Sequence, residues 1–180
     1  MERIKIDDIM PDFEFCTPFT EGEKLSKVVM EKKTALVFLR YYGCTLCQLD
    51  LAEYKAQYTK ITQAGGQLYV VLQSDPALLA EELGSSNALP YTIICDPKGE
   101  LYAQFAILPA QTKVKMAGAG TLLKIAKATA AGHKHGRYEG DELQLPAAFV
   151  LDTDRRVLYA HYGKTVDDVP DTKKLAAEMQ

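Results

Sequence analysis

The stretch from Thr34 to Cys47, which reads TALVFLRYYGCTLC, decides the fold. Its first six residues form an unbroken run of apolar, β-branched and aromatic side chains, which is typical of a strand buried on both faces. From Leu46 onward, apolar residues recur at helical spacing as far as Gly65 and Gly66, where glycine favours the left-handed conformation that ends a helix. Residues 67–72 repeat the buried-strand pattern. A strand, a helix and a second strand in this order predict a βαβ unit with two parallel strands and a right-handed crossover.

The rest of the chain extends this unit into a mixed sheet. The pattern predicts a helix at 76–83, a strand at 90–95, a helix at 120–131, a polar loop at 133–145, a hairpin of strands 146–152 and 157–162, and a helix at 171–179. Parallel strands first and an antiparallel hairpin last imply helices on both faces of a central sheet. We therefore expect an α/β fold in a single domain over residues 1–180, with an N-terminal extension at 1–33 and an insertion at about 107–145.

Composition excludes several classes of protein. The chain has 180 residues, of which 47% are hydrophobic and 25% are charged, and these fractions are typical of a globular domain. The net charge is −3 and no basic run occurs, so we expect no nucleic-acid partner. The apolar runs are far shorter than the ~20 residues that span a bilayer, and the first residues lack the apolar block of a secretion signal. We therefore expect no membrane association and a cytoplasmic location.

The turn from Gly43 to Cys47 carries the chemistry. Two residues separate Cys44 from Cys47, and the pair lies between a buried strand and the helix that follows it. At a helix N-terminus, unsatisfied backbone N–H groups and the macrodipole favour a thiolate over a thiol. We therefore predict that Cys44 is an exposed nucleophile with a lowered pKa, and that Cys47, one turn later and covered, is the resolving thiol. Such a pair can attack a disulfide and then release it, which is the minimum needed for two-electron exchange.

Other interpretations of the four cysteines stay open. The Cys-x-x-Cys pair can be two buried structural thiols, or half of a zinc site completed by His133 and His135, although zinc ligand pairs usually lie closer in sequence. The position before a helix favours redox use, so we expect no metal. Cys95 ends an apolar strand and is interpreted as a core residue, whereas Cys16 is a candidate for a further resolving thiol.

Leu145 and Pro146 form the second candidate site, for substrate binding. Proline lacks the ladder donor and occurs in sheets only at the start of a strand or at an edge, and Pro146 begins a predicted strand. We predict a cis bond between Leu145 and Pro146, which would turn the preceding carbonyl toward the dithiol as a backbone platform for a bound substrate. The first strand, the Gly-Cys-x-x-Cys turn, the helix and this late strand together resemble the thioredoxin fold.

A narrower resemblance covers nearly the whole chain. The segments that carry it are Pro11–Phe15, Phe38–Cys44, Leu89–Tyr102, Gly140–Leu151, Tyr159–Gly163 and Asp167–Pro170. They resemble the alkyl hydroperoxide reductase/thiol-specific antioxidant (AhpC/TSA) family, that is, the peroxiredoxins, and within it the divergent peroxiredoxin-like branch. The resemblance implies a thioredoxin-like, peroxiredoxin-like fold and thiol redox chemistry.

The chain departs from this family at the positions that bind peroxide. Typical peroxiredoxins have a threonine three residues and a proline seven residues before the peroxide-attacking cysteine, and an arginine about three residues before the aromatic residue of the late strand. Neither of the first two is present whether Cys44 or Cys47 is aligned with that cysteine, and Pro146 occupies the arginine position. The groups that polarise the O–O bond are thus replaced by the dithiol and proline of a disulfide exchanger. Arg40 could compensate in part by lying near the thiolate.

We therefore expect a thiol–disulfide oxidoreductase of peroxiredoxin-like type. Its substrate would form a mixed disulfide with Cys44, Cys47 would close a Cys44–Cys47 disulfide, and a cellular dithiol system of thioredoxin type would reduce that disulfide. One alternative is a thiol peroxidase, in which one cysteine becomes a sulfenic acid that the other resolves. The second alternative is a redox-sensing or adaptor module without turnover. No organic cofactor is implied, the substrate is a protein disulfide or a hydroperoxide, and a homodimer stays open.

Overall fold

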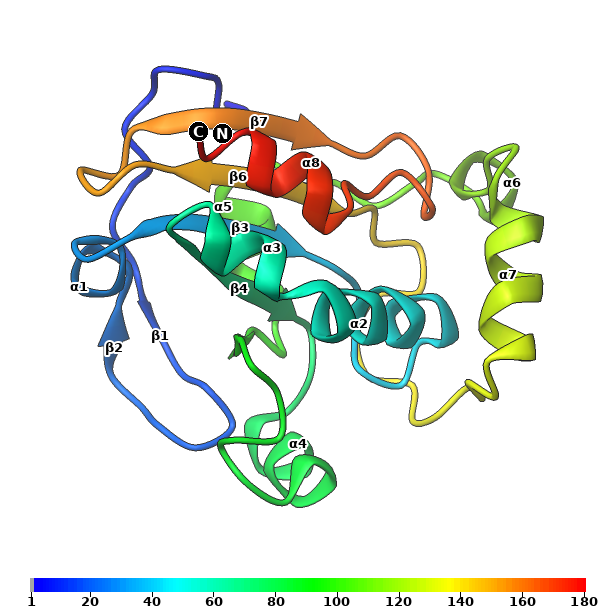
Figure 1. Ribbon diagram of the computed structural model, residues 1–180. Helices are drawn as coiled ribbons and strands as arrows, with labels where there is room; N and C mark the ends of the chain where they lie inside the picture. Colours follow the sequence, from blue (N-terminus) through cyan, green and yellow to red (C-terminus); the bar gives the residue numbers. More distant parts are fainter. Residues whose placement is uncertain (1) are drawn as a thin grey trace.

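The computed structural model describes residues 2–180 and contains a central sheet with helices on both of its faces (Figure 1). Its strands are β1 (Glu14–Phe15), β2 (Glu23–Lys24), β3 (Lys33–Phe38), β4 (Gly66–Leu72), β5 (Thr92–Cys95), β6 (Ala147–Leu151) and β7 (Val157–Tyr162). Its helices are α1 (Leu25–Val29), α2 (Thr45–Gln57), α3 (Thr59–Gln63), α4 (Pro76–Leu83), α5 (Glu100–Gln104), α6 (Lys113–Met116), α7 (Thr121–Ala130) and α8 (Thr172–Ala177). Within the described residues, no helix has the length and apolar character that a bilayer crossing requires.

The central sheet combines parallel and antiparallel strands in the order β5-β4-β3-β6-β7. β3 pairs in parallel with β4, with Thr34 opposite Gln67, and β4 pairs in parallel with β5. On its other side β3 pairs antiparallel with β6, with Phe38 opposite Ala147, and β7 follows β6 as the second arm of a hairpin. The prediction of a mixed α/β sheet is therefore confirmed. The carboxyl end of β3 leads directly into the turn that contains the two cysteines.

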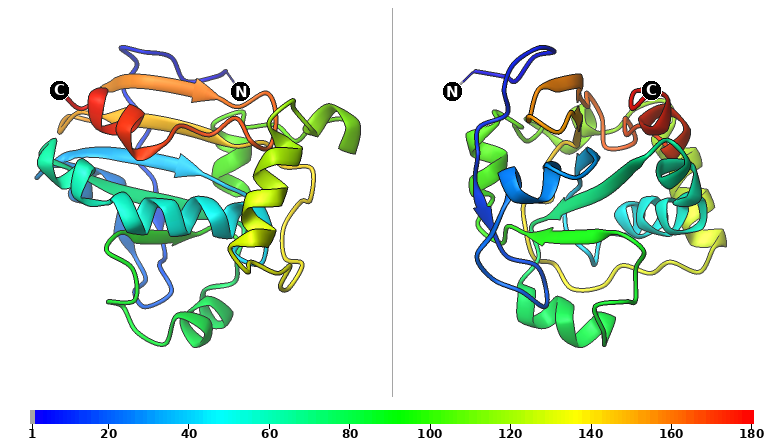
Figure 2. Two further views of the ribbon diagram at one scale, coloured as in Figure 1. Left: turned by 45° about the vertical axis from the view of Figure 1, so that its right-hand side comes forward. Right: turned by 60° about the vertical axis from the view of Figure 1, so that its left-hand side comes forward.

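Two apolar layers pack against the sheet, one on each face. Figure 2 shows helices on the two sides of the sheet. α2, α3 and α8 cover one face, where Tyr54 of α2 packs with Val37 of β3. α1 and α5 cover the other face, where Tyr102 of α5 packs with Phe38 and Phe149. Neighbouring residues of β3 belong to opposite layers because successive strand side chains point to opposite faces. This double burial explains the unbroken apolar run that predicts β3.

The predicted helix over residues 46–64 is divided at Tyr58 into α2 and α3. Tyr58 keeps right-handed helical angles (φ −56°, ψ −29°), and the Ile61 N–H donates to its carbonyl at 3.0 Å, an i to i+3 bond of the 3₁₀ type. Gly65 then takes a left-handed conformation (φ 75°) and ends the helical stretch as expected. The interruption lies at the end of α2 that is far from the cysteines.

The sequence pattern does not predict the small sheet of β1 and β2, nor α1 and α5. β1 and β2 have two residues each, which is too short for strand alternation to be visible. α5 follows Gly99, where the pattern predicts only a turn. Asp96 starts this helix, since its carboxylate accepts hydrogen bonds from the N–H groups of Glu100 and Leu101 at 2.9 and 2.8 Å.

Tyr102 links the ends of β3 and β4, and its removal should destabilise the fold. Its hydroxyl contacts the carbonyl oxygen of Leu39 and, at 2.8 Å, that of Val71. Tyr102→Phe should lower the free energy of unfolding by about 1–3 kcal/mol, because a buried carbonyl loses its donor. Urea unfolding measures this loss. Tyr138→Phe is the matched control, since Tyr138 is 65% exposed, and equal midpoints for the two variants would contradict the prediction.

Candidate active site

Cys44 and Cys47 lie where β3 ends and α2 begins. Cys44 is the N-cap residue of α2, with extended backbone angles (φ −71°, ψ 122°), and its Sγ accepts a hydrogen bond from the Cys47 N–H at 3.3 Å. Cys47 lies within the first turn of the helix, and both thiols are free. The predicted placement of the pair at a helix start is confirmed.

The guanidinium of Arg40 stabilises the negative charge on the Cys44 sulfur. Its Nη2 donates to the Cys44 Sγ at 2.9 Å, and its Nη1 donates to the carbonyl of Glu142 at 2.8 Å. The pKa of Cys44 is lowered to about 6, first by the hydrogen bond from the Cys47 thiol, then by the Arg40 charge and by backbone N–H groups at the helix start, while burial opposes this shift. These contributions together favour the thiolate form of Cys44. The helix N-terminus contributes, but the side chains of Cys47 and Arg40 contribute more.

The pKa of Cys47 is shifted in the opposite direction. Burial raises its pKa well above the ordinary thiol value, and the neighbouring Cys44 raises it further. Cys47 thus keeps its proton and can donate it in a hydrogen bond to the Cys44 sulfur. Because the thiolate is the nucleophile in thiol chemistry, this difference is in the direction that the predicted roles require, and attack by Cys44 and resolution by Cys47 stay predictions.

An ion pair between Asp50 and Lys124 lies behind the dithiol and is missed by sequence reasoning. The Lys124 Nζ is 2.7 Å from one carboxylate oxygen of Asp50 and 2.8 Å from the other. Burial raises the pKa of Asp50 to about 6 against the attraction of Lys124, and the Asp50 charge adds to the raised pKa of Cys47. The pair fastens the inserted α7 to α2. One feature of the sequence could have pointed to this ion pair. Asp50 comes three residues after Cys47, so its carboxylate lies on the same side of the helix as the dithiol.

Both thiols are buried, which corrects the expectation that Cys44 is an exposed nucleophile. Cys44 has 0% exposure and Cys47 has 3%. Residues 133–142, here called the covering segment, cross the start of α2 (yellow in Figure 1). The sequence pattern predicts a polar surface loop there. The loop is at the surface, but it packs over the dithiol because its backbone finds partners around the turn.

Hydrogen bonds hold the covering segment along its whole length. Near its start, the carbonyl of Lys134 accepts from the Gln48 Nε2 at 2.9 Å, and the Gly136 N–H donates to the Gly43 carbonyl at 2.8 Å. The other contacts join Tyr41 to His135, Ser74 and Asp75 to Glu139, Gln73 to Asp141, and Arg40 to Glu142. The segment is thus bound to residues on both sides of the buried Cys44, and we expect its motion to govern access to the sulfur.

The expected cis bond between Leu145 and Pro146 is wrong, since residues 2–180 contain no cis peptide bond. The carbonyls of this site also have partners within the protein. The Leu145 carbonyl accepts from the Gln144 Nε2 at 3.1 Å, and the Pro146 carbonyl accepts from the Gly163 N–H at 2.9 Å, which continues the β6–β7 pairing. A free backbone platform is thus missing, and substrate binding by Leu145 and Pro146 stays a prediction.

The remaining candidates are dispersed over the fold. His135 stacks on Tyr138, with ring centroids 3.9 Å apart, and belongs with His133 to the covering segment. In the part of the chain that the structure describes, no three side chains of His, Cys, Asp or Glu gather as metal ligands would. Cys16 lies opposite Cys95 at the outer edge of β5, with β4 between β5 and β3. The structure therefore pairs Cys16 with Cys95 and does not place it against Cys44.

The sequence from Asp50 onward identifies the family. A family model described as "AhpC/TSA antioxidant enzyme" matches residues 50–165. This chain belongs to that family. The match begins at Asp50, so the Cys44–Cys47 turn lies just before the matched part. No curated protein matches the sequence.

Solved structures of redox proteins have the same fold. Peroxidoxin BcpB from Mycobacterium tuberculosis is 17% identical over 98% of this chain and 97% of its own, with a TM-score of 0.67. A cysteine-to-serine mutant of peroxiredoxin 6 of Arenicola marina is 13% identical over 98% of this chain and 72% of its own, with a TM-score of 0.72. A putative thiol:disulfide interchange protein DsbE from Chlorobium tepidum is 17% identical over 98% and 99%, with a TM-score of 0.60. These similarities confirm the thioredoxin-like, peroxiredoxin-like fold.

Removal of the Cys47 thiol should raise the pKa of Cys44, because it removes the largest of the contributions that lower it. Thiolate ultraviolet absorbance against pH measures this pKa in a Cys16→Ser/Cys95→Ser background. The parent should show one step near pH 6, and Cys47→Ala should move that step upward. Cys47→Ser keeps a hydroxyl donor and should move it less. A parent protein without a step below pH 8 would contradict the assignment of Cys44 as the thiolate.

Gly43→Ala should expose Cys44 by displacing the covering segment. An added Cβ at Gly43 would lie 2.2 Å from the Arg137 carbonyl oxygen, which is a backbone atom and cannot rotate away. Alkylation of Cys44 by iodoacetamide, followed by mass spectrometry, should then be at least severalfold faster. Gly136→Ala is the matched control in the same contact, because its Cβ would meet the Gly43 Cα at a milder 3.2 Å. Unchanged alkylation in Gly43→Ala would show that this segment does not limit access.

Proposed function

We propose that this protein reduces hydroperoxides, with Cys44 as the attacking thiolate and Cys47 as the resolving thiol. One observation carries the proposal, namely the hydrogen bond from the Arg40 guanidinium to the buried Cys44 Sγ at 2.9 Å. A guanidinium in this place keeps the sulfur ionised. It also offers N–H donors to an oxygen atom that gains negative charge as the O–O bond breaks. The Arg40 Nε is buried and has no partner within the described residues, so one donor is free for this task.

The reaction balances with these residues and one external reductant. The Cys44 thiolate attacks the distal peroxide oxygen, an S–O bond forms, the O–O bond breaks, and the leaving alkoxide takes up a proton to become an alcohol, or water when the substrate is hydrogen peroxide. Cys44 is then a sulfenic acid. The Cys47 sulfur attacks the Cys44 sulfur, a disulfide forms and water leaves. A cellular dithiol reduces the disulfide and is itself oxidised by two electrons.

This ranking reverses the sequence-based expectation, in which exchange with protein disulfides comes first. That expectation depended on the absence of the threonine and arginine that polarise peroxide, and on the presence of the dithiol and proline of a disulfide exchanger. A Cys44 under the covering segment is easier for a small peroxide to reach than for an extended polypeptide. Arg40 also supplies a donor that the missing family residues would otherwise provide. Membership of the AhpC/TSA family supports a redox enzyme, and the choice of peroxide is our proposal.

Exchange with protein disulfides is the second candidate. It is favoured by the dithiol itself, because Cys44 at a helix N-cap with Cys47 in the first turn can form and resolve a mixed disulfide. Both candidates need the same external dithiol, for which we propose a thioredoxin-type system. A reducing compartment such as the cytoplasm would supply it.

Arg40→Gln should slow peroxide reduction roughly a hundredfold, because one donor to the transition state is lost. Stopped-flow oxidation by hydrogen peroxide and by an organic hydroperoxide measures the rate. The measurement is made at pH 9, where the Cys44 thiolate is formed in both proteins. Alkylation by iodoacetamide at the same pH should change far less, since it uses the thiolate but breaks no O–O bond.

Three comparisons make this test decisive. Arg156→Gln, in the exposed turn at the other end of the sheet, should leave the peroxide rate unchanged. Equal losses of peroxide reduction and alkylation would mean that Arg40 only ionises Cys44, and the proposal would fail. Faster turnover with insulin disulfides than with either peroxide would favour the second candidate. Oxidation that stops after one equivalent despite a thioredoxin-type system would favour redox sensing.

A further inference from the structure

Cys16 and Cys95 form a second pair of thiols, which the dithiol mechanism does not use. Cys16 directly follows β1, and Cys95 is the last residue of the edge strand β5. The two residues are directly opposite each other in an isolated antiparallel bridge, in which the Cys95 N–H donates to the Cys16 carbonyl at 2.9 Å. The Cys16 Sγ also contacts the Cys95 carbonyl oxygen at 3.5 Å.

The two side chains lie on the same face of the bridge. Cys95 belongs to the apolar layer under α2, and Cys16 packs against that same layer. Their neighbours Phe15 and Ile94 belong to the opposite layer. This alternation is what strand geometry requires when opposite residues share a face. The Cβ atoms of the two cysteines therefore point to the same side.

Backbone spacing in such a pair suits a disulfide. Opposed residues joined by backbone hydrogen bonds in an antiparallel pair have Cα atoms about 5.5 Å apart, which is inside the range of about 4.4–6.8 Å found across disulfides. We propose that Cys16 and Cys95 are a site of reversible disulfide formation, oxidised by small disulfide compounds. The bond would fasten the N-terminal segment to the edge strand of the sheet.

Accessibility sets the order of the two steps. Cys16 is half-exposed, whereas Cys95 is 5% exposed and its pKa is raised to about 12 by burial. The Cys16 thiolate therefore attacks the small disulfide first, and one thiolate of that compound leaves. The Cys95 sulfur, after losing its proton to water, then attacks the Cys16 sulfur and releases the second thiolate. Two protein thiols are oxidised by two electrons, and the small disulfide is reduced to two thiols.

The surroundings of the pair favour a cationic oxidant. Cys16 and Cys95 line a surface hollow. The charged residues that also line it are Asp12, Glu14, Glu21, Asp96, Lys98 and Glu100. Five carboxylates against one ammonium attract positive charge and repel negative charge. A diamine disulfide such as cystamine should thus react faster than the anionic glutathione disulfide.

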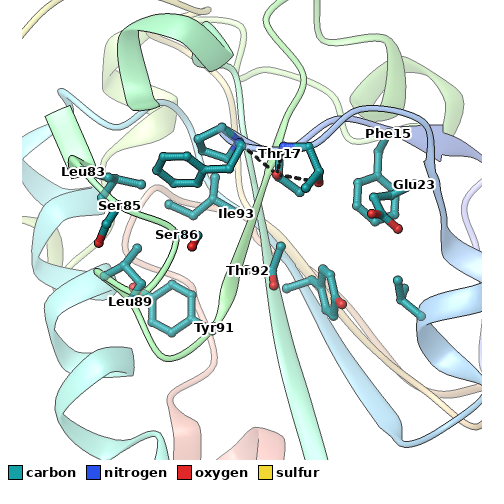
Figure 3. A pocket seen from close by; sticks show the side chains of 15 residues that line it. Phe15, Thr17, Glu23, Leu83, Ser85, Ser86, Leu89, Tyr91, Thr92 and Ile93 are labelled. Carbon is teal, nitrogen blue, oxygen red and sulfur yellow. Dashed lines mark hydrogen bonds between the residues drawn. The ribbon is translucent and has the colours of Figure 1, made fainter. Parts of the chain in front are cut away.

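A disulfide here would also hold one wall of a neighbouring pocket in place. Figure 3 shows this pocket, with Thr17 on one side and Thr92 and Ile93 of β5 on the other. Thr17 begins a compact turn, since its N–H donates to the Thr20 carbonyl at 2.8 Å. Because Cys16 directly precedes this turn, a bond to Cys95 would tie the turn to β5. Oxidation should therefore reduce the mobility of residues 16–20.

The experiment uses the full chain with Cys44→Ser and Cys47→Ser, so that the dithiol cannot contribute. The folded protein is incubated with cystamine, denatured, alkylated and analysed by mass spectrometry. We expect a species two hydrogen masses lighter that takes up no alkylating group and yields a linked peptide of Cys16 and Cys95. A further Cys95→Ser change should trap one cysteamine, half of cystamine, as a mixed disulfide on Cys16, whereas a further Cys16→Ser change should leave Cys95 unmodified.

Several results would overturn the proposal. One is a stable mixed disulfide of cysteamine with Cys16 that Cys95 does not resolve, and another is a link that forms only in urea. Equal rates of oxidation by cystamine and by glutathione disulfide at low salt would show that the acidic hollow does not attract the oxidant. Urea unfolding of the oxidised and reduced forms provides a second measurement, because a bond between residues 79 positions apart should raise the midpoint, and a dithiol should reverse the rise.

Discussion

A thiolate without contact to water must take its stabilising donors from the protein, and this requirement organises the site around Cys44. Burial alone would favour the neutral thiol. The guanidinium of Arg40, the thiol of Cys47 and the backbone at the start of α2 outweigh burial and lower the pKa of Cys44 to about 6. β3 delivers Arg40 and Cys44 to the same end of the sheet, because only a short turn separates the strand from the helix. The rigid double-sided packing of β3 therefore determines the geometry of the reactive group.

The predicted insertion at about 107–145 contributes contacts to the site. Arg40 spans the two, since one of its nitrogens contacts Cys44 and another contacts the carbonyl of Glu142. A second attachment joins Lys124 of α7 to Asp50 of α2, behind the dithiol. Motion of the insertion and the charge state of the dithiol are therefore physically linked. Loss of the Cys44 charge would weaken the contact of Arg40 with the Cys44 sulfur and leave its hydrogen bond to the Glu142 carbonyl unchanged.

Most of the sheet could be predicted from sequence because its signals are local. The apolar run of β3, the cap and proline at Asp75 and Pro76, and the glycine stop after α3 each depend on neighbouring residues. The Cys-x-x-Cys pair belongs to the same class of signal. The burial of Cys44 could not be predicted, since it depends on tertiary packing in a turn whose Gly43 binds a segment about ninety residues later in the chain. The prediction of a cis bond before Pro146 was wrong for a related reason. The isomer of this bond and the pairing of Pro146 with Gly163 depend on tertiary packing.

The covering segment is bound at the dithiol through main-chain groups, namely the carbonyls of Lys134 and Glu142 and the N–H of Gly136, and elsewhere through the side chains of His135 and Glu139. Side chains such as Arg137 extend into solvent and take little part in this attachment. Mutation can thus change the charge and bulk at the entrance to Cys44 one residue at a time while the loop keeps its course. Gly43 and Gly140 are less open to such change, because a Cβ added at Gly43 would clash with the Arg137 backbone and one added at Gly140 would clash with the Gln73 side chain. One thiol chemistry can in this way acquire different substrate preferences during evolution, with the reactive centre left intact.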